Sequence, residues 1–446
     1  MPSRAAAGSF DLVPATSVDL YQVEGYEARA RVIASVTDTT TTDPTEVDPF
    51  LATADGVRHA AYRSLTTAGP IHWQRFPSGA TGWLVTGYEA ARSALSDPRL
   101  AKGGPGDGPY ANDIRPDVAA AIDSHLLALD PPDHTRLRRL LTAAFTRRRS
   151  ELLAPRIQEL TDNLLDAMTE RFATSDEPVD LITAFAYPLP IAVICELLGV
   201  PEDDRADFRA WTGPLVAGGM AGFEAYSNAA TALVDYVHEL LARKRREPAE
   251  DLLSALVAVR DQGDRLTENE LTAMVYLLLI AGHETTVNLI ANGIRALLMH
   301  PDQLAVLRAE PDRMAAAVEE LLRYDGPLQS AIPMVTVAPL EIGGAQLDAG
   351  ELVVISLLAA NRDPARHPEA DRLDVTRPET AHLAFGHGIH RCVGAPLAQV
   401  EGRIAIGSLI RRFERLELAV PATDLARTPG LLMNSLVTLP VRLSAE

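Results

Sequence analysis

The segment FGHGIHRCVGAPLA, residues 385–398, constrains this chain most, because it surrounds one of only two cysteines with glycines and cations. His390 and Arg391 immediately precede Cys392, and such neighbours lower the pKa of a thiol electrostatically. A helical pattern follows over residues 395–412, so the sulfur is expected near a helix N-terminus, where the dipole favours negative charge. Three glycines allow the backbone to approach the sulfur: Gly386, Gly388 and Gly394. The sequence therefore predicts a thiolate at position 392.

Three roles for Cys392 are open on these residues alone. Free cysteines are usually small buried hydrophobes, although a core position has no need of three glycines and two cations. Zinc is the second role, since His387 and His390 are close in sequence, but a structural zinc site needs four ligands and no CxxC pair occurs. The third is the axial thiolate of a haem iron. The residues favour this third role.

Composition bounds the class of protein. With 446 residues, 47% of them hydrophobic, the chain can bury a large core, and its two cysteines suit a reducing compartment. The N-terminus lacks the apolar stretch of a signal peptide, and no segment offers the ~20 uninterrupted apolar residues that span a bilayer. A formal net charge of −19 argues against nucleic acid as a partner. We therefore expect a soluble cytoplasmic protein that binds neither nucleic acid nor membrane.

The chain reads as one large domain over residues 46–446, preceded by a leader. Residues 1–45 show no sustained period, so we expect them to be partly disordered. Helical periodicity dominates residues 119–330, with no linker long enough to mark a domain boundary. Strand-like runs lie outside that region, over residues 73–76, 83–85, 333–337, 340–342, 351–356 and 436–443. The expected fold is mainly α with a minor β portion.

The longest helical pattern runs over residues 267–300, where Thr267 and Glu270 form a capping box at its start. At 1.5 Å per residue it would extend ~50 Å, enough to cross a whole domain. Its AGHETT motif supplies two small residues and an acid–alcohol pair: Ala281, Gly282, Glu284 and Thr285. A hydroxyl that bonds the preceding turn is the simpler interpretation. A cluster of this kind inside a buried helix is more typical of a functional site.

Two further pairs have helical spacing. Glu320 and Arg323 share one helix face and by themselves predict only a surface ion pair worth ~0.3 kcal/mol. His134 and Arg138, four residues apart, are suited to binding a carboxylate ligand, although a solvated helix face is the ordinary interpretation.

Taken together, these motifs resemble those of the cytochrome P-450 superfamily, and the chain is similar to its soluble bacterial class. FxxGxHxCxG resembles the haem-ligand loop, AGHETT the distal-helix pattern and Glu320-Leu-Leu-Arg323 the ExxR pair. The resemblance covers the chain from about residue 70 onward, in the expected order. It implies a single P-450 domain with a long central distal helix, and haem b (iron protoporphyrin IX) as cofactor.

The resemblance also implies roles. Cys392 would be the axial iron ligand, Glu284 would relay protons, Thr285 would donate a hydrogen bond on the oxygen side of the haem, and Gly282 would make room for dioxygen. The other expected haem contacts are His134, Arg138, Ala281, Phe385, His390 and Gly394, with His134, Arg138 and His390 on the propionates. Glu320, Arg323 and Arg372 would form a network that anchors the Cys392 loop.

The sequence departs from the resemblance at one position. Bacterial members usually carry a propionate-binding arginine where this chain has Met334. A propionate would therefore need another donor.

The implied activity is insertion of one atom of dioxygen, by hydroxylation or epoxidation. Electrons would come ultimately from NAD(P)H through a ferredoxin or flavodoxin with its reductase. We expect Arg139, Arg147 and Arg391 to dock that acidic donor. We expect the walls of the substrate pocket in residues 103–124, 208–226, 328–335 and 433–437. Walls rich in Ala, Leu and Val suit a bulky apolar natural product such as a polyketide, macrolide or terpenoid. The enzyme is expected to be a monomer.

Two alternatives accompany this interpretation. The first is an enzyme of the same superfamily that catalyses oxidative coupling or a peroxide-driven reaction, in which the acid–alcohol pair is often absent. The second is a non-catalytic haem electron carrier or sensor. Glu284 and Thr285 argue against the second, because an electron carrier has no need of a proton relay.

Overall fold

The computed structural model describes residues 48–102, 113–142, 145–172, 177–217, 221–261, 266–378 and 380–444. Contacts divide the chain into two compact units, Met1–Thr42 and Asp43–Glu446. The leader expected over residues 1–45 lies outside the described residues. All elements below belong to the second unit.

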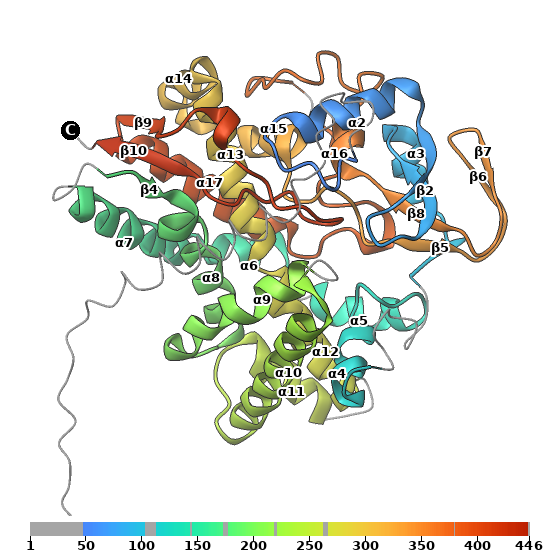
Figure 1. Cartoon of the computed structure of the whole chain (residues 1–446). Coiled ribbons are helices and arrows are strands. Elements are labelled where there is room, and N and C mark those ends of the chain that lie inside the picture. Colours follow the sequence, from blue (N-terminus) through green and yellow to red (C-terminus); the bar gives the residue numbers. More distant parts are fainter. Residues whose placement is uncertain are drawn as a thin grey trace, which may run out of the picture. The chain divides into compact units, whose positions relative to one another are not determined.

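Helices form most of this unit, as the sequence predicts (Figure 1). The helices in the first half are α2 (Val57–Ala68), α3 (Tyr88–Ala94), α4 (Pro116–Asp123), α5 (Asp133–Thr142), α6 (Arg147–Leu152), α7 (Ala154–Phe172), α8 (Pro188–Leu198) and α9 (Phe208–Ala217). Those in the second half are α10 (Phe223–Arg246), α11 (Leu252–Asp261), α12 (Glu268–Ala281), α13 (Glu284–Met299), α14 (Pro301–Ala309), α15 (Met314–Asp325), α16 (Leu357–Asn361) and α17 (Ala395–Arg412). Short helical turns, among them η1 (Ile182–Ala186), η2 (Glu202–Asp207) and η5 (Gly388–His390), join some of them.

The β portion comprises three small sheets. A five-stranded sheet has the order β1-β2-β8-β5-β3, in which β2 and β8 are parallel and the other neighbours antiparallel. Its strands are β1 (Ile71–Arg75), β2 (Thr81–Val85), β3 (Leu100–Ala101), β5 (Met334–Thr336) and β8 (Leu352–Ile355). A hairpin joins β6 (Leu340–Ile342) to β7 (Ala345–Leu347), and β10 (Pro440–Ser444) pairs with β4 (Val179–Asp180) and β9 (Arg415–Leu418). The prediction of a mainly α fold with a minor β portion is confirmed.

The long central helix is interrupted, which corrects the expectation of one continuous helix over residues 267–300. α12 begins at the predicted capping box of Thr267 and Glu270 and ends at Ala281, and α13 begins at Glu284. His283 adopts φ −124° and ψ −47°, outside helical values, so the backbone bonds of one turn are lost there. The AGHETT motif therefore lies at the junction of two helices.

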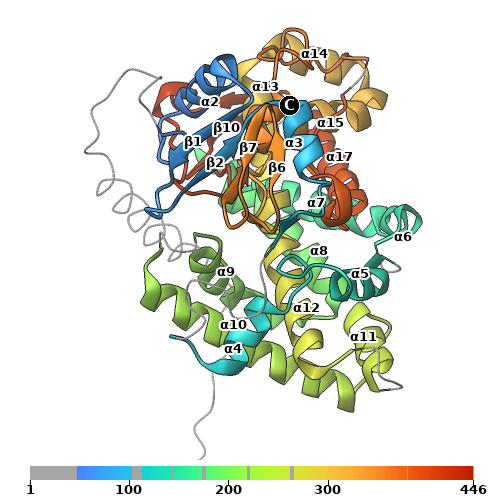
Figure 2. The ribbon, with the colours of Figure 1, turned by 90° about the vertical axis from the view of Figure 1, so that its right-hand side faces the viewer.

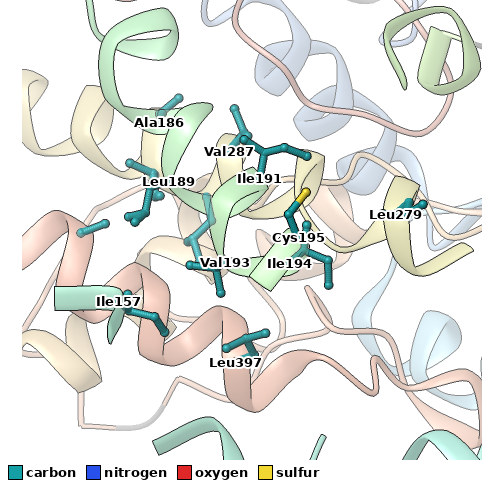
Figure 3. Close-up of a cluster of buried hydrophobic side chains, with 14 of the residues drawn as sticks. Ile157, Ala186, Leu189, Ile191, Val193, Ile194, Cys195, Leu279, Val287 and Leu397 are labelled. Atoms are coloured by element: carbon teal, nitrogen blue, oxygen red, sulfur yellow. The ribbon is translucent and has the colours of Figure 1, made fainter. Parts of the chain in front are cut away.

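Helices gather on both sides of this junction. α4, α9, α10 and α11 accompany α12, whereas α8, α14, α15 and α17 lie against α13 (Figures 1 and 2). Apolar side chains pack beside the junction, with Ile194 and Cys195 of α8 between Leu279 of α12 and Val287 of α13 (Figure 3). One helical stretch, Glu268–Met299, is long and apolar enough to cross a membrane by length and composition, but 72% of its most apolar window is buried inside the protein.

A buried carboxylate, Asp325 at the end of α15, joins four separate parts of the fold. Its Oδ1 accepts hydrogen bonds from His59 Nε2 at 2.9 Å and Asn434 Nδ2 at 2.8 Å. Its Oδ2 accepts from Arg427 at 2.7 Å and Arg295 at 3.3 Å. These donors come from α2, α13 and the segment before β10, so one side chain links the first described helix to the C-terminal region.

The Asp325→Asn variant tests this link. Removing one partner of a buried ionic network leaves the arginines uncompensated, so the free energy of unfolding should fall by ~3–5 kcal/mol at pH 7. Asp424→Asn, at an exposed carboxylate, is the matched control and should change stability little. Denaturant unfolding monitored by circular dichroism measures both.

The pH dependence of stability checks the same account. Burial raises the pKa of Asp325, but Arg427, His59 and Arg295 outweigh it and hold the pKa well below the usual 3.8. The contribution of Asp325 is therefore present above pH 3.8 and is lost as the pH falls toward the folded-state pKa. In the Asp325→Asn variant, the free energy of unfolding should fall less steeply as the pH drops below 3.8. The same pH dependence in the variant and the wild type would contradict the assignment.

Candidate functional site

The Cys392 loop precedes α17 and carries its sulfur at the N-terminus of that helix. Cys392 donates its N–H to Phe385 O at 2.8 Å, which closes the loop. The N–H groups of Gly394 and Ala395 are directed at the sulfur. Gly386 and Gly388 adopt φ of 68° and 70°, in the left-handed region that favours glycine. The predicted geometry of this loop, with backbone donors turned toward the thiol, is confirmed.

The sulfur of Cys392 is accessible to a ligand, because the residue is exposed. Desolvation by the surrounding loop raises the pKa of the thiol, whereas the N–H groups of Gly394 and Ala395, with Arg138 and Arg391, lower it. A metal cation on the sulfur would stabilise the thiolate further.

A buried ion pair anchors the segment that leads into this loop. Arg323 makes a bidentate contact with Glu320, at 2.7 and 2.8 Å, and both side chains are buried rather than on the surface. The remaining Arg323 donors reach the carbonyl oxygens of Asn361, Ala370 and Arg372. The pair therefore holds the chain between α16 and the Cys392 loop.

The third member of this network is Arg377, and the expectation of Arg372 is wrong. Arg377 Nε lies 3.2 Å from both carboxylate oxygens of Glu320. The Arg372 side chain instead extends into solvent and pairs with Glu369, and only its carbonyl oxygen contacts Arg323. The two arginines are five residues apart in a loop, so sequence matching could not tell which one turns inward.

A second anchor lies one residue earlier on α15. Glu319 accepts hydrogen bonds from His382 Nε2 at 3.0 Å and from Gln399 Nε2 at 2.7 Å. These partners flank the Cys392 loop, one before it and one on α17. No sequence motif includes Glu319, although its position beside Glu320 is a signal for a second contact to the same loop.

Donors converge beside the loop at the position expected for the propionates. The rings of His134 and His390 lie 4.3 Å apart, and all four of their nitrogens are buried without a hydrogen-bond partner among the described residues. Burial lowers the pKa of both, that of His390 to about 3, so both rings are neutral and each has one N–H to donate. Arg138 lies beside them and donates to Arg391 O at 2.5 Å. Buried unpaired donors of this kind fit an anionic ligand.

Lys102 is a further cation at this position and was missed from the sequence. It lies at the end of β3 and donates from Nζ to Ile332 O at 2.8 Å. Burial is the main cause of the lowered pKa of His390, and the nearby charge of Lys102 is the second. Burial lowers the pKa of Lys102 itself to about 8, which leaves it mostly charged at neutral pH. Lys102 could therefore supply the donor that Met334 does not, because Met334 is buried in the apolar cluster around the five-stranded sheet.

At the helix junction, side chains replace the missing backbone bonds. His283 Nδ1 donates to Leu279 O at 2.7 Å, and Thr285 Oγ1 donates to Ala281 O at 3.1 Å. Within α13, Asn288 Nδ2 donates to Glu284 O at 2.9 Å. The acid–alcohol pair thus stands at the first turn of α13, where the dipole favours the Glu284 carboxylate.

Close packing explains why residue 282 is a glycine, which the sequence alone did not indicate. A Cβ there would lie 2.4 Å from Leu278 O and 2.8 Å from the Ile194 side chain. The glycine therefore allows α8 to pack against the junction. Ala281 is exposed, so it is the residue of this pair that borders open space.

The zinc alternative finds no support. Among the described residues, the grouping of His, Cys, Asp and Glu that could hold a metal ion consists of Asp117, Asp235 and His238, all exposed and none of them in the Cys392 loop. Arg115 already contacts both of those aspartates.

Comparison with known proteins identifies the family. A family model described as Cytochrome P450 matches residues 221–438. The cytochrome P450 monooxygenase PikC of Streptomyces venezuelae is 47% identical over 390 residues, covering 86% of this chain and 90% of PikC. The chain belongs to the cytochrome P450 family. Another relative of this P450 is the mycinamicin IV hydroxylase/epoxidase of Micromonospora griseorubida. It is 41% identical over a match that covers 85% of this chain and 94% of the relative.

Solved P450 structures share the fold. The tirandamycin C-bound P450 monooxygenase TamI superposes with a TM-score of 0.80 at 43% identity, covering 88% of this chain and 98% of TamI. The P450 is therefore a haem-dependent monooxygenase that receives electrons from NAD(P)H through a redox partner and acts on a small molecule. Thiolate-bound haem iron supplies the oxygen-activating chemistry of such enzymes.

Lys102→Met tests the assignment of Lys102 to the haem edge. Loss of one charge-assisted hydrogen bond to a buried anion should weaken haem retention by about tenfold or more. Transfer of haem to an excess of apomyoglobin measures the release rate. Arg99→Met, three residues earlier and paired with Asp97, is the matched control. Equal release rates for both variants and the wild type would exclude a role for Lys102.

Proposed function

We propose that this P450 hydroxylates or epoxidises a bulky, largely apolar natural product of the polyketide, macrolide or terpenoid kind. The observation that carries the proposal is the similarity over nearly the whole chain to an enzyme named for mycinamicin IV and to a P450 bound to tirandamycin C. Two segments expected to line the substrate pocket are joined by a bridge between Leu328 and Met433, and Gln329 donates to the carbonyl oxygens of Gly430 and Met433. One backbone bridge and one side chain therefore hold these two segments together.

In this proposal Cys392 would hold the haem iron through its sulfur, and Thr285 and Glu284 would hold and pass protons at the α12–α13 junction. The Glu284 side chain is 18% exposed, so it can exchange protons with water while it remains attached to a buried helix. Thr285 donates to Ala281 O, which leaves its oxygen free to accept a hydrogen bond. His134, Arg138, His390 and Lys102 hold the propionates.

Electrons arrive, in the same proposal, from an acidic ferredoxin or flavodoxin that docks over the Cys392 loop, on a monomeric cytoplasmic enzyme. Arg139, Arg147 and Arg391 are exposed. The Arg138 contact to Arg391 O brings α5 against the loop, and Arg403 of α17 pairs with Glu151 of α6 at 3.0 Å. Ile389 and Leu152 are exposed hydrophobics beside these arginines, 46% and 72% accessible. Cations around apolar residues are typical of a transient protein interface.

A spectroscopic titration tests the substrate class. Mycinamicin IV and tirandamycin C are added to the purified P450, with a small polar alcohol as control, and the Soret band is followed. A compound that enters the pocket should shift the band from low to high spin at micromolar concentration. Binding of the polar alcohol but of neither scaffold would contradict the proposal.

Turnover of the compound that binds tests the acid–alcohol pair. Thr285→Ala should retain haem and the spin shift, yet form product at least several-fold less per dioxygen consumed and release more peroxide, because proton delivery is impaired. Glu284→Gln should slow turnover in the same assay. Unchanged coupling in both variants would overturn their proposed role.

Charge reversal tests donor docking. Arg147→Glu should lower the second-order rate of reduction by the ferredoxin about tenfold at low ionic strength, with a smaller effect as salt rises. Arg75→Glu, on the edge strand β1, is the matched control for an exposed arginine. Reduction rates that do not depend on salt would count against this surface.

A further inference from the structure

Glu319 of α15 contacts both sides of the Cys392 loop. Its Oε2 lies 3.0 Å from His382 Nε2, and its Oε1 accepts a hydrogen bond from Gln399 Nε2 at 2.7 Å. His382 precedes Cys392 by ten positions, and Gln399 follows it by seven, on α17. One carboxylate therefore joins the two chain segments that present the sulfur between them.

The His382 side chain also bonds the backbone of the loop. The Ala384 N–H donates to His382 Nδ1 at 3.1 Å, so the ring hydrogen lies on Nε2, the nitrogen that faces Glu319. The carboxylate and the backbone N–H together fix the tautomer of the ring. The next residue, Phe385, packs against the His382 ring at 5.8 Å between ring centroids and accepts the Cys392 N–H at 2.8 Å. Direct contacts therefore connect the carboxylate to the backbone of the cysteine.

On the other side of the loop, Gln399 connects α17 to the same carboxylate. The N–H groups of Gly394 and Ala395, at the start of this helix, face the sulfur and lower the pKa of the thiol. Gln399 lies about one turn further along, and a helix moves as a unit over so short a distance. The contact between Gln399 and Glu319 therefore helps to set where these N–H donors lie relative to α15.

Glu319 is ionised at neutral pH and lies close to the charges around the sulfur. Burial raises its pKa, but the hydrogen bonds from His382 and Gln399 and the charge of Arg391 outweigh burial and hold the pKa below the usual 4.5. Arg391 directly precedes Cys392, so the negative charge of Glu319 acts on the immediate surroundings of the sulfur. A negative charge near a metal site disfavours the addition of an electron there.

We propose that Glu319 is a positioning residue for the haem iron, which holds the two sides of the Cys392 loop together and lowers the reduction potential of the iron through its negative charge. The inference rests on the proposed binding of that iron by Cys392. It goes beyond that proposal because it assigns control of the ligand loop to a side chain of another helix, α15. Residues that contact the surroundings of a metal ligand in this way orient the ligand and tune the potential of the metal.

Two substitutions separate the effect of the hydrogen bonds from that of the charge. Glu319→Gln keeps an oxygen that can accept from His382 and removes the negative charge at nearly constant shape. His382→Phe keeps a ring against Phe385 and leaves the carboxylate in place, but removes both ring nitrogens. Glu310→Gln, at an exposed glutamate that pairs with Arg313 on the surface, is the matched control.

The first measurement is the reduction potential of the haem-loaded enzyme, from a spectroelectrochemical titration. Glu319→Gln should shift the potential upward, because the added electron no longer meets this negative charge. His382→Phe retains the carboxylate and should shift the potential less, and Glu310→Gln should leave it at the wild-type value. A purely structural role for Glu319 would not move the potential in a variant that keeps its shape. An unchanged potential in Glu319→Gln would therefore overturn the proposal.

The second measurement is the rate at which the iron loses its thiolate ligand in mild denaturant. The reduced enzyme is saturated with carbon monoxide, and the decay of the red-shifted Soret band that a thiolate ligand gives is followed. His382→Phe should accelerate the decay by roughly tenfold, because one hydrogen bond to a charged group is lost. Gln399→Met, which releases α17 from the carboxylate, should also accelerate it, and Glu310→Gln should not.

Decay rates equal to the wild type in both His382→Phe and Gln399→Met would also overturn the proposal. If His382→Phe does not fold, Gln399→Met carries this second test alone. Failure of the proposed iron ligand is distinguishable from failure of this inference. Without a Cys392 ligand the wild type itself would lack the red-shifted band, whereas failure of the inference leaves that band intact and the variants indistinguishable from the wild type.

Discussion

The position of the Cys392 sulfur depends on the buried contact between Glu320 and Arg323. Burying two opposite charges costs several kcal/mol for each ion, and their attraction repays this only when every donor is used. Here the guanidinium also holds three carbonyl oxygens of the chain between α16 and the loop, and Arg377 completes the carboxylate. The buried pair therefore fixes the backbone of the segment that leads to Cys392. Closer to the loop, Glu319 plays a similar part, because it accepts hydrogen bonds from His382 before the loop and from Gln399 after it.

The opposite side of the site depends on a defect in a helix. Continuous helix over residues 268–299 would satisfy every backbone group internally and leave none for chemistry. At the interruption, the side chains of His283 and Thr285 bond the carbonyl oxygens of Leu279 and Ala281. The same residues thus stabilise the junction and present an acid and a hydroxyl. The core thus contains both the anchored Cys392 loop and the interrupted helix between α12 and α13.

Sequence reasoning predicted the parts that follow from local pattern. The capping box at Thr267 and the helix after Cys392 each depend on residues within a few positions of one another. Motif resemblance added the family, which the relatives confirm. The prediction of Arg372 failed because a loop decides which arginine turns inward. Lys102 and Asp325 were missed because their partners are distant in the chain.

The central claim is that Cys392 is the ligand of the haem iron, and X-ray absorption at the iron edge tests it most directly. The wild-type enzyme should show one sulfur neighbour of the iron besides the nitrogens of the porphyrin. Cys392→His, which keeps a ligand at the same position, should retain haem and lose that sulfur. A sulfur neighbour that persists in the variant, or its absence from the wild type, would contradict the account.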